Sequence, residues 1–351
     1  MKENILVRGE NMKNKLPLGK LEFSFLEKLL ENYQSKPDSR VIIGPKLGED
    51  AAVIEYPDRY LVAKTDPITF ATQEIGWYAV QVNANDIATR GAVPKWFQAT
   101  ILLPENKTTE ELVENIFSQI YNACNQLNIA VIGGHTEISY NLDRPIVVGC
   151  MLGEVEKNKL VSTSGARPGD VIILTKGIVI EGTAIIAREK QEELRDKGYS
   201  EGFIKKCQNF IYKPGLSVLK EALLANQFEV HAMHDPTEGG LSAGLYEIAQ
   251  ASQSGLLVEK DKIYLLEEAQ KLCNEFNLNP LNVLTSGTLL IVTSKSESGK
   301  IISLLAKEGI NSYLIGEIKE RDYGIKIKNK NNNIEKDLIY SAEDEIIRVF
   351  K

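Results

Sequence analysis

Cysteine is scarce in this chain, whose 351 residues include only four, at positions 124, 150, 207 and 273. No two of them have the C-x-x-C spacing, and none lies in a cluster with histidine. These absences argue against the common zinc sites and against a disulfide framework. We therefore expect four reduced and mostly buried thiols.

Long apolar runs and an excess of basic residues are also absent. No stretch reaches the length that a bilayer-spanning helix needs, and residues 1–5 include an acidic residue and no apolar signal-peptide region. The 41 Lys and Arg residues against 48 Asp and Glu residues give a net charge of −7, which argues against a nucleic-acid partner. The sequence thus predicts a cytoplasmic protein that binds neither a membrane nor a nucleic acid.

The two common phosphate-binding motifs are missing as well. The nearest match to G-x-x-x-x-G-K-[ST], residues 177–183, lacks the lysine that contacts the β- and γ-phosphates. The 26 glycines include no G-x-G-x-x-G string. Any bound nucleotide is therefore held in another way.

The chain does contain enough apolar residues for a sizeable core, 43% of the total. Chains of this length rarely fold around a single core, so we expect two domains. Strands and helices alternate, and several strands are too close together for helical crossovers, which predicts an α+β fold. The pattern breaks into a charged stretch with Gly, Pro and Ser over residues 154–169. We predict an arm and helix over residues 1–40, a first domain over 41–155 and a second over 165–351.

Periodicity and turn residues predict the individual elements. The expected helices are 21–33, 75–90, 108–127, 184–187, 202–212, 216–225 and 241–252. The expected strands are 41–43, 51–56, 60–64, 96–103, 129–132, 145–152, 171–175, 288–292 and 312–318. Thr108 and Glu111 form a capping box that opens the longest of these helices.

Acidic residues stand at the ends of several predicted elements. Asp50 lies in a turn before a strand, Asp66 follows a strand, and Asp86 shares a helix face with Asn83 and Arg90. Mg²⁺ is usually held by one or two carboxylates together with waters and substrate phosphates, so these three aspartates are candidate metal ligands. The alternatives are a cap or turn role for each aspartate and an ion pair between Asp86 and Arg90.

Two glycine-containing loops follow predicted strands. In residues 132–137, two adjacent glycines allow backbone N–H groups to approach a ligand closely. In residues 233–241, another glycine pair precedes a helix whose N-terminus faces the loop and attracts anions. The alternative for both is a tight turn in which His135 or His234 is a hydrogen-bonded loop histidine.

Taken together, these strings resemble the superfamily of aminoimidazole ribonucleotide (AIR) synthetase, selenophosphate synthetase, thiamine-monophosphate kinase and the hydrogenase maturation protein HypE. The matching strings are 48–53, 64–67, 83–92, 133–137 and 235–241, with the junction 165–170. Similarity is greatest to the HypE branch and its AIR-synthase-related relatives, for which Asn85-Asp86 and Asp235-Pro236-Thr237-x-Gly239-Gly240 are typical.

The resemblance implies a fold, cofactors and site residues. The implied fold is a ferredoxin-like N-terminal α/β sheet domain that dimerises, followed by a larger α/β C-terminal domain, with ATP and Mg²⁺ in the cleft between them. The implied metal ligands are Asp50, Asp66 and Asp86. The implied cofactor-binding residues are Lys20, Asp50, Lys64, Asn83, Asp86, Gly133, Gly134 and Glu137. The implied catalytic residues, near the phosphates or the second substrate, are His135, Asp235 and Glu238.

The sequence departs from the HypE pattern at its end. HypE has a flexible Pro-Arg-x-Cys tail whose cysteine carries the carboxamide that ATP dehydrates, whereas residues 344–351 contain no cysteine. A thiolate is needed for that chemistry, and Cys207, which follows two lysines, is the one substitute in the chain. The glycine-rich arm of selenophosphate synthetase is missing too. We therefore expect ATP binding without the use of a terminal thiol.

These features predict an ATP- and Mg²⁺-dependent enzyme, related to hydrogenase maturation, that activates an amide, carbonyl or carboxylate oxygen by phosphorylation. Its partners are expected to be a second copy of the chain, an unidentified small molecule or protein side chain as substrate, and a maturation partner protein. The alternatives are a small-molecule kinase like thiamine-monophosphate kinase and a non-catalytic ATP-binding protein.

Overall fold

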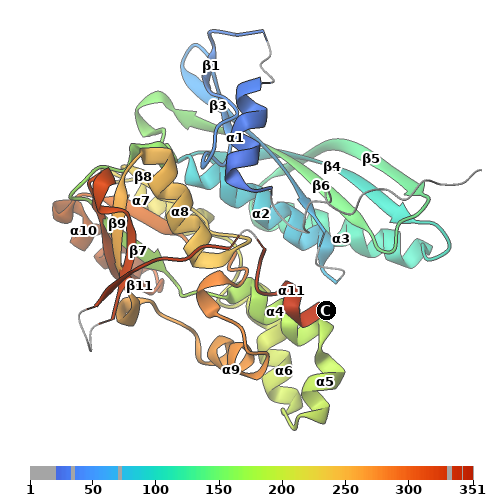
Figure 1. The fold of residues 1–351 in the computed structure, drawn as a ribbon. Coiled ribbons are helices and arrows are strands. Elements are labelled where there is room, and N and C mark those ends of the chain that lie inside the picture. The colour runs from blue at the N-terminus through green and yellow to red at the C-terminus, as the bar shows by residue number, and fades with distance from the viewer. Residues whose placement is uncertain (1–20, 33–35, 70–72, 330–333, 342, 351) are drawn as a thin grey trace, which may run out of the picture.

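The structure, a computed structural model, describes residues 21–32, 36–69, 73–329, 334–341 and 343–350. Two mixed β-sheets, each covered by helices, make up its two halves (Figure 1). The α+β class expected from the sequence is confirmed. The predicted domain limits stay a prediction, although two short 3₁₀ turns, Lys157–Lys159 and Thr163–Gly165, lie between the two sheets in the chain.

The first sheet has six strands in the order β1-β2-β3-β6-β4-β5. Its elements are α1 (Phe23–Asn32), β1 (Val41–Ile43), β2 (Ala52–Glu55), β3 (Arg59–Ile68), α2 (Ile75–Thr89), β4 (Val93–Pro104), α3 (Glu110–Gln126), β5 (Ala130–Ser139) and β6 (Ile146–Glu156). Strands β4 and β5 run parallel, and the other described neighbours are antiparallel. Within the described residues β5 pairs only with β4, so it is an edge strand.

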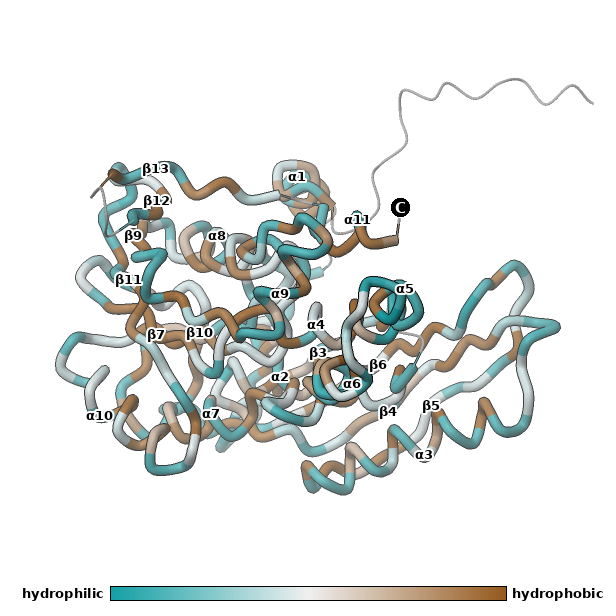
Figure 2. The backbone as a smooth tube through the Cα atoms, turned by 90° about the horizontal axis from the view of Figure 1, so that it is seen from below, coloured by the Kyte–Doolittle hydropathy of each residue, from teal (hydrophilic) through white to brown (hydrophobic). Residues whose placement is uncertain are grey.

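The second sheet has seven strands in the order β13-β12-β9-β11-β7-β10-β8. Its strands are β7 (Val171–Thr175), β8 (Ala232–His234), β9 (Gly255–Glu259), β10 (Leu290–Thr293), β11 (Ser312–Lys319), β12 (Ile325–Lys328) and β13 (Glu335–Asp337). Its helices are α4 (Ile180–Glu189), α5 (Gln191–Asp196), α6 (Glu201–Gln208), α7 (Leu219–Ala225), α8 (Gly240–Ser252), α9 (Glu267–Glu275), α10 (Lys295–Lys307) and α11 (Ile347–Phe350). Strands β7 and β10, which both have neighbours on either side, are fully buried. Their residues are largely hydrophobic (Figure 2). None of the helices in the described ranges is long and apolar enough to cross a membrane.

Helix α2 joins the two halves. All fifteen of its residues are buried, because it packs on β3 and β6 of the first sheet and on α7 and β8 of the second half. The polar side of the helix is therefore buried as well as its apolar side. Asn85 shows how it is satisfied: its amide donates to the carbonyl of Leu216 (2.9 Å) and accepts from the N–H of Val218 (2.8 Å). Polar residues of α2 thus fix one half of the molecule against the other.

Strand β3 is longer than the sequence predicts. It continues to Ile68, so Asp66 lies within the strand rather than after it. Proline is tolerated where a strand lacks a neighbour on its N–H side, and β2 pairs with β3 only as far as Ala63. Pro67 therefore leaves the pairing of β3 with β6 intact.

Strand β5 is also longer than predicted, and it includes the first glycine pair, Gly133 and Gly134. Residues 133–137 are extended strand and not a loop. A Cβ atom on Gly134 would lie 2.2 Å from the carbonyl oxygen of Ala99 on β4. Glycine at this position therefore allows two strands to approach, which is a structural reason for the motif. A smaller difference is that Thr109, not Thr108, caps helix α3.

Candidate functional site

Three carboxylates from three different elements converge beside α2. Asp50 precedes β2, Asp86 lies on α2, Asp235 follows β8, and one oxygen of each lies within 4.8 Å of the others. Asp86 and Asp235 are only 4% and 2% exposed. Neither oxygen of Asp235 has a hydrogen-bond partner among the described residues. Leaving a buried carboxyl group unpaired is costly, and a group of oxygen donors of this kind fits a divalent cation such as Mg²⁺.

The charges of this acidic cluster are strongly perturbed. Burial raises the pKa of Asp86 to about 7, and the neighbouring carboxylates of Asp66 and Asp50 add to the effect although Lys64 opposes it. Burial also raises the pKa of Asp235 well above its usual range, with Asp86 and Asp50 as further causes. Burial by itself would raise the pKa of Asp50 too, but His234 and Arg90 outweigh it and hold that pKa well below its usual range. A cation among the three would relieve their mutual repulsion.

Lys64 contacts the cluster from β3. Its Nζ lies 3.1 Å from Oδ2 of Asp86 and 3.5 Å from Oδ2 of Asp66. Asp66 is therefore linked to the cluster through Lys64 and is not one of the three converging carboxylates. The ion pair between Asp86 and Arg90 that the sequence left open does not form, because Lys64 is the partner of Asp86 and Arg90 pairs with other acids.

His234 lies behind Asp50 and holds it in place. Its Nδ1 is 3.0 Å from Oδ1 of Asp50, and its Nε2 is 2.6 Å from Oε2 of Glu247 on α8. Burial alone would lower the pKa of His234, but Asp50 and Glu247 outweigh it and raise that pKa well above its usual value. A carboxylate oxygen thus lies within hydrogen-bond distance of each ring nitrogen, an arrangement that favours the protonated ring, in which both nitrogens donate. Outer partners in metal sites orient a ligand in the same way.

Arg90 connects the cluster to the junction between the sheets. Its guanidinium is fully buried and pairs with the carboxylates of Glu49 and Asp50, the latter at 3.0 Å. It also donates to Oγ1 of Thr163 (2.6 Å) and to the carbonyl of Met233 (3.1 Å). One side chain thus bridges the loop before β2, the 3₁₀ turn at the junction and strand β8, and so fixes Asp50 relative to Asp235.

A cavity of about 630 Å³ opens over the cluster. A volume of this order is typical of small-molecule and cofactor sites. Besides the cluster and Lys64, its lining includes Asp66 on β3, Glu238 after β8, and Leu21, Phe23 and Leu26 at helix α1. Phe23 stacks on Tyr246 of α8, with ring centroids 5.4 Å apart. Helix α1 thus forms one wall of the cavity.

The loop after β8 is held from the C-terminal segment. Asp344 accepts hydrogen bonds from the N–H groups of Gly239 (2.7 Å), Leu284 (3.2 Å) and Ile346 (2.8 Å). Burial raises the pKa of Asp344 to about 6 in spite of these bonds. The segment before α11 therefore fixes the loop that carries Asp235 and Glu238.

The remaining predicted site residues lie elsewhere. Within the described ranges, Gly133, Gly134, His135 and Glu137 are on the edge strand β5, and none of them lines the cavity over the acidic cluster. The side chain of His135 is 65% exposed, with Nε2 3.1 Å from Oε2 of Glu137. Asn83 is buried and donates to the carbonyls of Asp66 and Ala79 at 3.2 and 2.8 Å. Lys20 lies outside the described residues.

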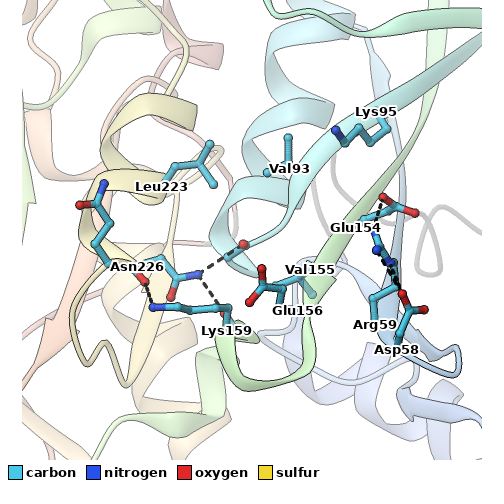
Figure 3. Close-up of a pocket in the computed structure, with 12 residues that line it drawn as sticks. Asp58, Arg59, Val93, Lys95, Glu154, Val155, Glu156, Lys159, Leu223 and Asn226 are labelled. Atoms are coloured by element: carbon cyan, nitrogen blue, oxygen red, sulfur yellow. Dashed lines mark hydrogen bonds and ion pairs between the residues drawn. The ribbon is translucent and has the colours of Figure 1, made fainter.

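A second cavity, of about 380 Å³, lies at another part of the junction (Figure 3). It shares none of its described lining residues with the cavity over the acidic cluster. The amide of Asn226 donates to the carbonyls of Gly91 (3.3 Å) and Lys159 (2.9 Å), and Lys159 donates back to the carbonyl of Asn226 (2.9 Å). Arg59 pairs there with Glu154 at 2.8 Å. The bonds between Asn226, Gly91 and Lys159 brace the junction, whereas Arg59 and Glu154 join β3 to β6 within the first sheet.

Two buried acids near the cavity were not assigned a role from the sequence. Glu247 contacts His234 from α8, thirteen positions later in the chain. Glu181, on α4, is buried and contacts Ser286, and burial raises its pKa to about 8. The two residues of each pair are not related by any sequence motif. Glu247 and Glu181 reach the site only because α8 and α4 pack there.

The fold and this cluster define a class: a two-sheet α+β protein with a buried acidic cluster at the junction of its halves. Two family models match the chain in keeping with this class. Residues 48–155 match the N-terminal domain of AIR synthase related protein, and residues 167–328 match its C-terminal domain. The chain therefore belongs to the AIR synthase related family, as its motifs indicate.

Named relatives of similar length support the family assignment. A putative hydrogenase expression/formation protein of Methanocaldococcus jannaschii is 28% identical, over 82% of this chain and 84% of that protein. The carbamoyl dehydratase HypE of Rhizobium leguminosarum bv. viciae is 25% identical, over 79% of both chains. The thiamine-monophosphate kinase of Pyrococcus horikoshii is 24% identical, over 80% of this chain and 85% of the kinase.

Solved structures show the same fold. HypE of E. coli superposes with a TM-score of 0.71 at 19% identity, over 82% of this chain and 88% of HypE. A hydrogenase maturation protein HypE in complex with ATP gives a TM-score of 0.66 at 21% identity, over 87% and 92% of the two chains. A chain from a HypE–HypF complex gives 0.68 at 19% identity, over 91% of this chain and all of that one.

Proposed function

We propose that this protein is an ATP- and Mg²⁺-dependent enzyme of the HypE type, which phosphorylates an amide, carbonyl or carboxylate oxygen of its substrate. The observation that carries the proposal is the convergence of Asp50, Asp86 and Asp235 under a cavity of about 630 Å³, with both oxygens of Asp235 unpartnered by any described residue. Two further findings support it: relatives are named as HypE, and a HypE structure with the same fold is a complex with ATP.

The residues divide into three roles under this proposal. Asp50, Asp86 and Asp235 hold Mg²⁺, which when bound neutralises phosphate charge during phosphoryl transfer. His234 and Arg90 orient Asp50. Asp66 and Glu238, which line the same cavity, face the acceptor and are placed to take up or return its proton. This assignment differs from the expectation from the sequence in two ways. Asp235 is now a proposed metal ligand, and Asp66 is now proposed to contact the acceptor.

Calorimetry with Mg·ATP tests the proposal through the variant Asp235→Asn, which keeps the shape of the side chain and removes its charge. We expect a loss of affinity of about 100-fold or more, because the loss of a direct ligand costs at least as much as the loss of an outer metal-site partner, and we expect loss of ATP turnover. Asp58→Asn is the matched control, since Asp58 is exposed, lines the cavity of Figure 3 and does not line the cavity over the acidic cluster. Equal affinity of Asp235→Asn and the unmodified protein for Mg·ATP would refute the metal assignment.

We also propose a maturation partner protein, for which the HypE–HypF complex is the precedent. A further proposal is a homodimer formed through the β5 edge. An edge strand with exposed apolar residues invites pairing, and Ile132, Ile138 and Tyr140 on or beside β5 are all exposed. Light scattering at micromolar concentration tests the dimer. A monomeric mass contradicts it, and Ile138→Lys is expected to weaken it.

A small-molecule kinase resembling thiamine-monophosphate kinase is the second candidate. It is favoured by the state of the thiols: burial raises the pKa of Cys124, Cys207 and Cys273 to about 12. Cys207, the one internal substitute for a terminal thiol, is therefore a poor acceptor. Product analysis separates the candidates, because a kinase leaves a stable phosphorylated product and a dehydratase leaves a dehydrated one. A non-catalytic protein binds ATP and releases neither.

A further inference from the structure

We infer that Lys64 is an exchangeable counter-ion of the acidic cluster, which holds Asp86 while no divalent cation is bound and is displaced from it when the cation enters. The ammonium group that is set free then contacts the phosphates of the nucleotide. This inference rests on the proposed function, because it takes a divalent cation and a nucleotide as ligands of one cavity.

The position of the ammonium group carries the argument. Nζ of Lys64 is closer to Asp86, at 3.1 Å, than to Asp66, at 3.5 Å. Asp86 is one of the three residues whose oxygens lie within 4.8 Å of one another. The lysine and a metal ion therefore compete for the same carboxylate. Asp66, outside the cluster, remains a partner for Lys64 after it leaves Asp86.

Lysine is suited to such an exchange. Its ammonium is a compact point charge on a flexible four-carbon stem, whereas arginine binds carboxylates through a rigid fork. Lys64 also lines the cavity, and its side chain keeps contact with solvent. In contrast, Arg90, which pairs with Asp50, is fully buried and is held by four groups. One cation of the site is thus fixed, and the other can move into the cavity.

The charge balance gives the direction of the effect. Repulsion between an ammonium group and a neighbouring ion is proportional to the charge of that ion, so a divalent metal is disfavoured twice as strongly as a proton. Removing the ammonium therefore strengthens metal binding more than it strengthens the competing protonation of the carboxylates. If Lys64 had a purely structural role, its removal would instead weaken metal binding, because Asp86 would lose the contact that orders it.

Binding of Mn²⁺ alone, followed by its EPR signal at pH 8, tests the inference on the full chain. We expect Lys64→Met to bind Mn²⁺ about tenfold more tightly and Mn²⁺ with a non-hydrolysable ATP analogue about tenfold more weakly than the unmodified protein. Lys64→Arg, which keeps the charge, should return the affinity for Mn²⁺ toward its original value. Thermal unfolding of each variant checks that it is folded.

Lys46 provides a matched control. It lies at the rim of the same cavity, and within the described part of the chain it forms no ion pair. Lys46→Met removes the same charge and should change the affinity for Mn²⁺ less than about twofold. Unchanged or weaker Mn²⁺ binding by folded Lys64→Met would overturn the inference. If the unmodified protein bound Mn²⁺ but no nucleotide, the proposed function would fail, and the Mn²⁺ measurements alone would decide whether Lys64 is exchanged.

Discussion

Two stretches of this chain contain nearly the same residues in different settings. Residues 132–137 and 233–241 each combine a histidine, a Thr-Glu pair and two adjacent glycines. His234 is buried between the carboxylates of Asp50 and Glu247. His135 lies on an edge strand, exposed, and contacts only the exposed Glu137 in the described structure. The residue types are equivalent, and the surroundings are not.

The difference shows what turns such a string into a site. Strand β8 is also at the edge of its sheet, but α2 and the 3₁₀ turn at Thr163–Gly165 pack against it. Charges placed there are removed from water and interact strongly. Strand β5 contacts helix α3, but its residues from Gly133 to Glu137 are all exposed, so its charges are screened by water. We therefore expect substitutions at the junction to have large effects and those on β5 small ones.

The largest effect is expected for Arg90→Met. The substitution removes a buried guanidinium and leaves the carboxylates of Glu49 and Asp50 without their partner. Breaking a buried ion pair from one side costs about 3–5 kcal/mol, which chemical denaturation will measure. Arg59→Met is the control, because Arg59 is 46% exposed and its loss should cost below about 1 kcal/mol. Equal losses for the two variants would show that the junction is not the stabilising region we describe.

The next largest effect concerns pH and Glu181. Burial raises the pKa of Glu181 to about 8 in the folded protein from 4.5, so the folded state binds a proton that the unfolded state has released. Stability is therefore lost as the pH rises between these two values, by up to about 1.4 kcal/mol per pH unit. Glu181→Gln removes this dependence, and its advantage over the unmodified protein should grow from pH 5 to pH 8. Parallel pH profiles for the two proteins would contradict the prediction.

Local patterns predicted the regular parts of the fold. Strands 41–43 and 171–175 were predicted with the limits that the structure has, because short apolar runs bounded by turn residues are typical of strands. The first of the two is largely exposed and the second is buried. Strands β3 and β5 were predicted too short, because Pro67 and the Gly133-Gly134 pair are usually signs of a strand end. In both places the neighbouring strand, which the local sequence does not reveal, decides whether pairing continues.

The site was predictable in part. The aspartates at positions 50, 86 and 235 stand out in the sequence through their positions at element ends, and the family resemblance places all three at the cleft. That Asp235, not Asp66, completes the group depends on how β8 packs against α2. The contacts of His234 with Glu247 and of Arg90 with Thr163 join separate elements, so no spacing along the chain indicates them.

An intermediate effect is expected at the β5 glycines, which form a matched pair. Both have positive φ, 146° at Gly133 and 153° at Gly134. An added Cβ would meet nothing within 4 Å at Gly133 but would lie 2.2 Å from the Ala99 oxygen at Gly134. Gly134→Ala should therefore be less stable than Gly133→Ala by about 1–3 kcal/mol, the usual cost of overpacking. Thermal and chemical unfolding of the two variants will show whether β4 and β5 are as close as described.

The smallest effect is expected for His135→Ala. An exposed ion pair contributes little, so the free energy of unfolding should change by less than about 0.5 kcal/mol, and the affinity for Mn²⁺ should not change at all. The expectation for Mn²⁺ holds for one copy of the chain, in which His135 does not line the cavity over the acidic cluster. If His135→Ala weakened Mn²⁺ or nucleotide binding, the dependence on protein concentration would identify the cause. A loss confined to concentrations at which the protein is dimeric would mean that β5 of a second copy reaches the site and that His135 acts there. A loss at every concentration would mean that the two regions are connected within one chain, and our separation of them would be wrong.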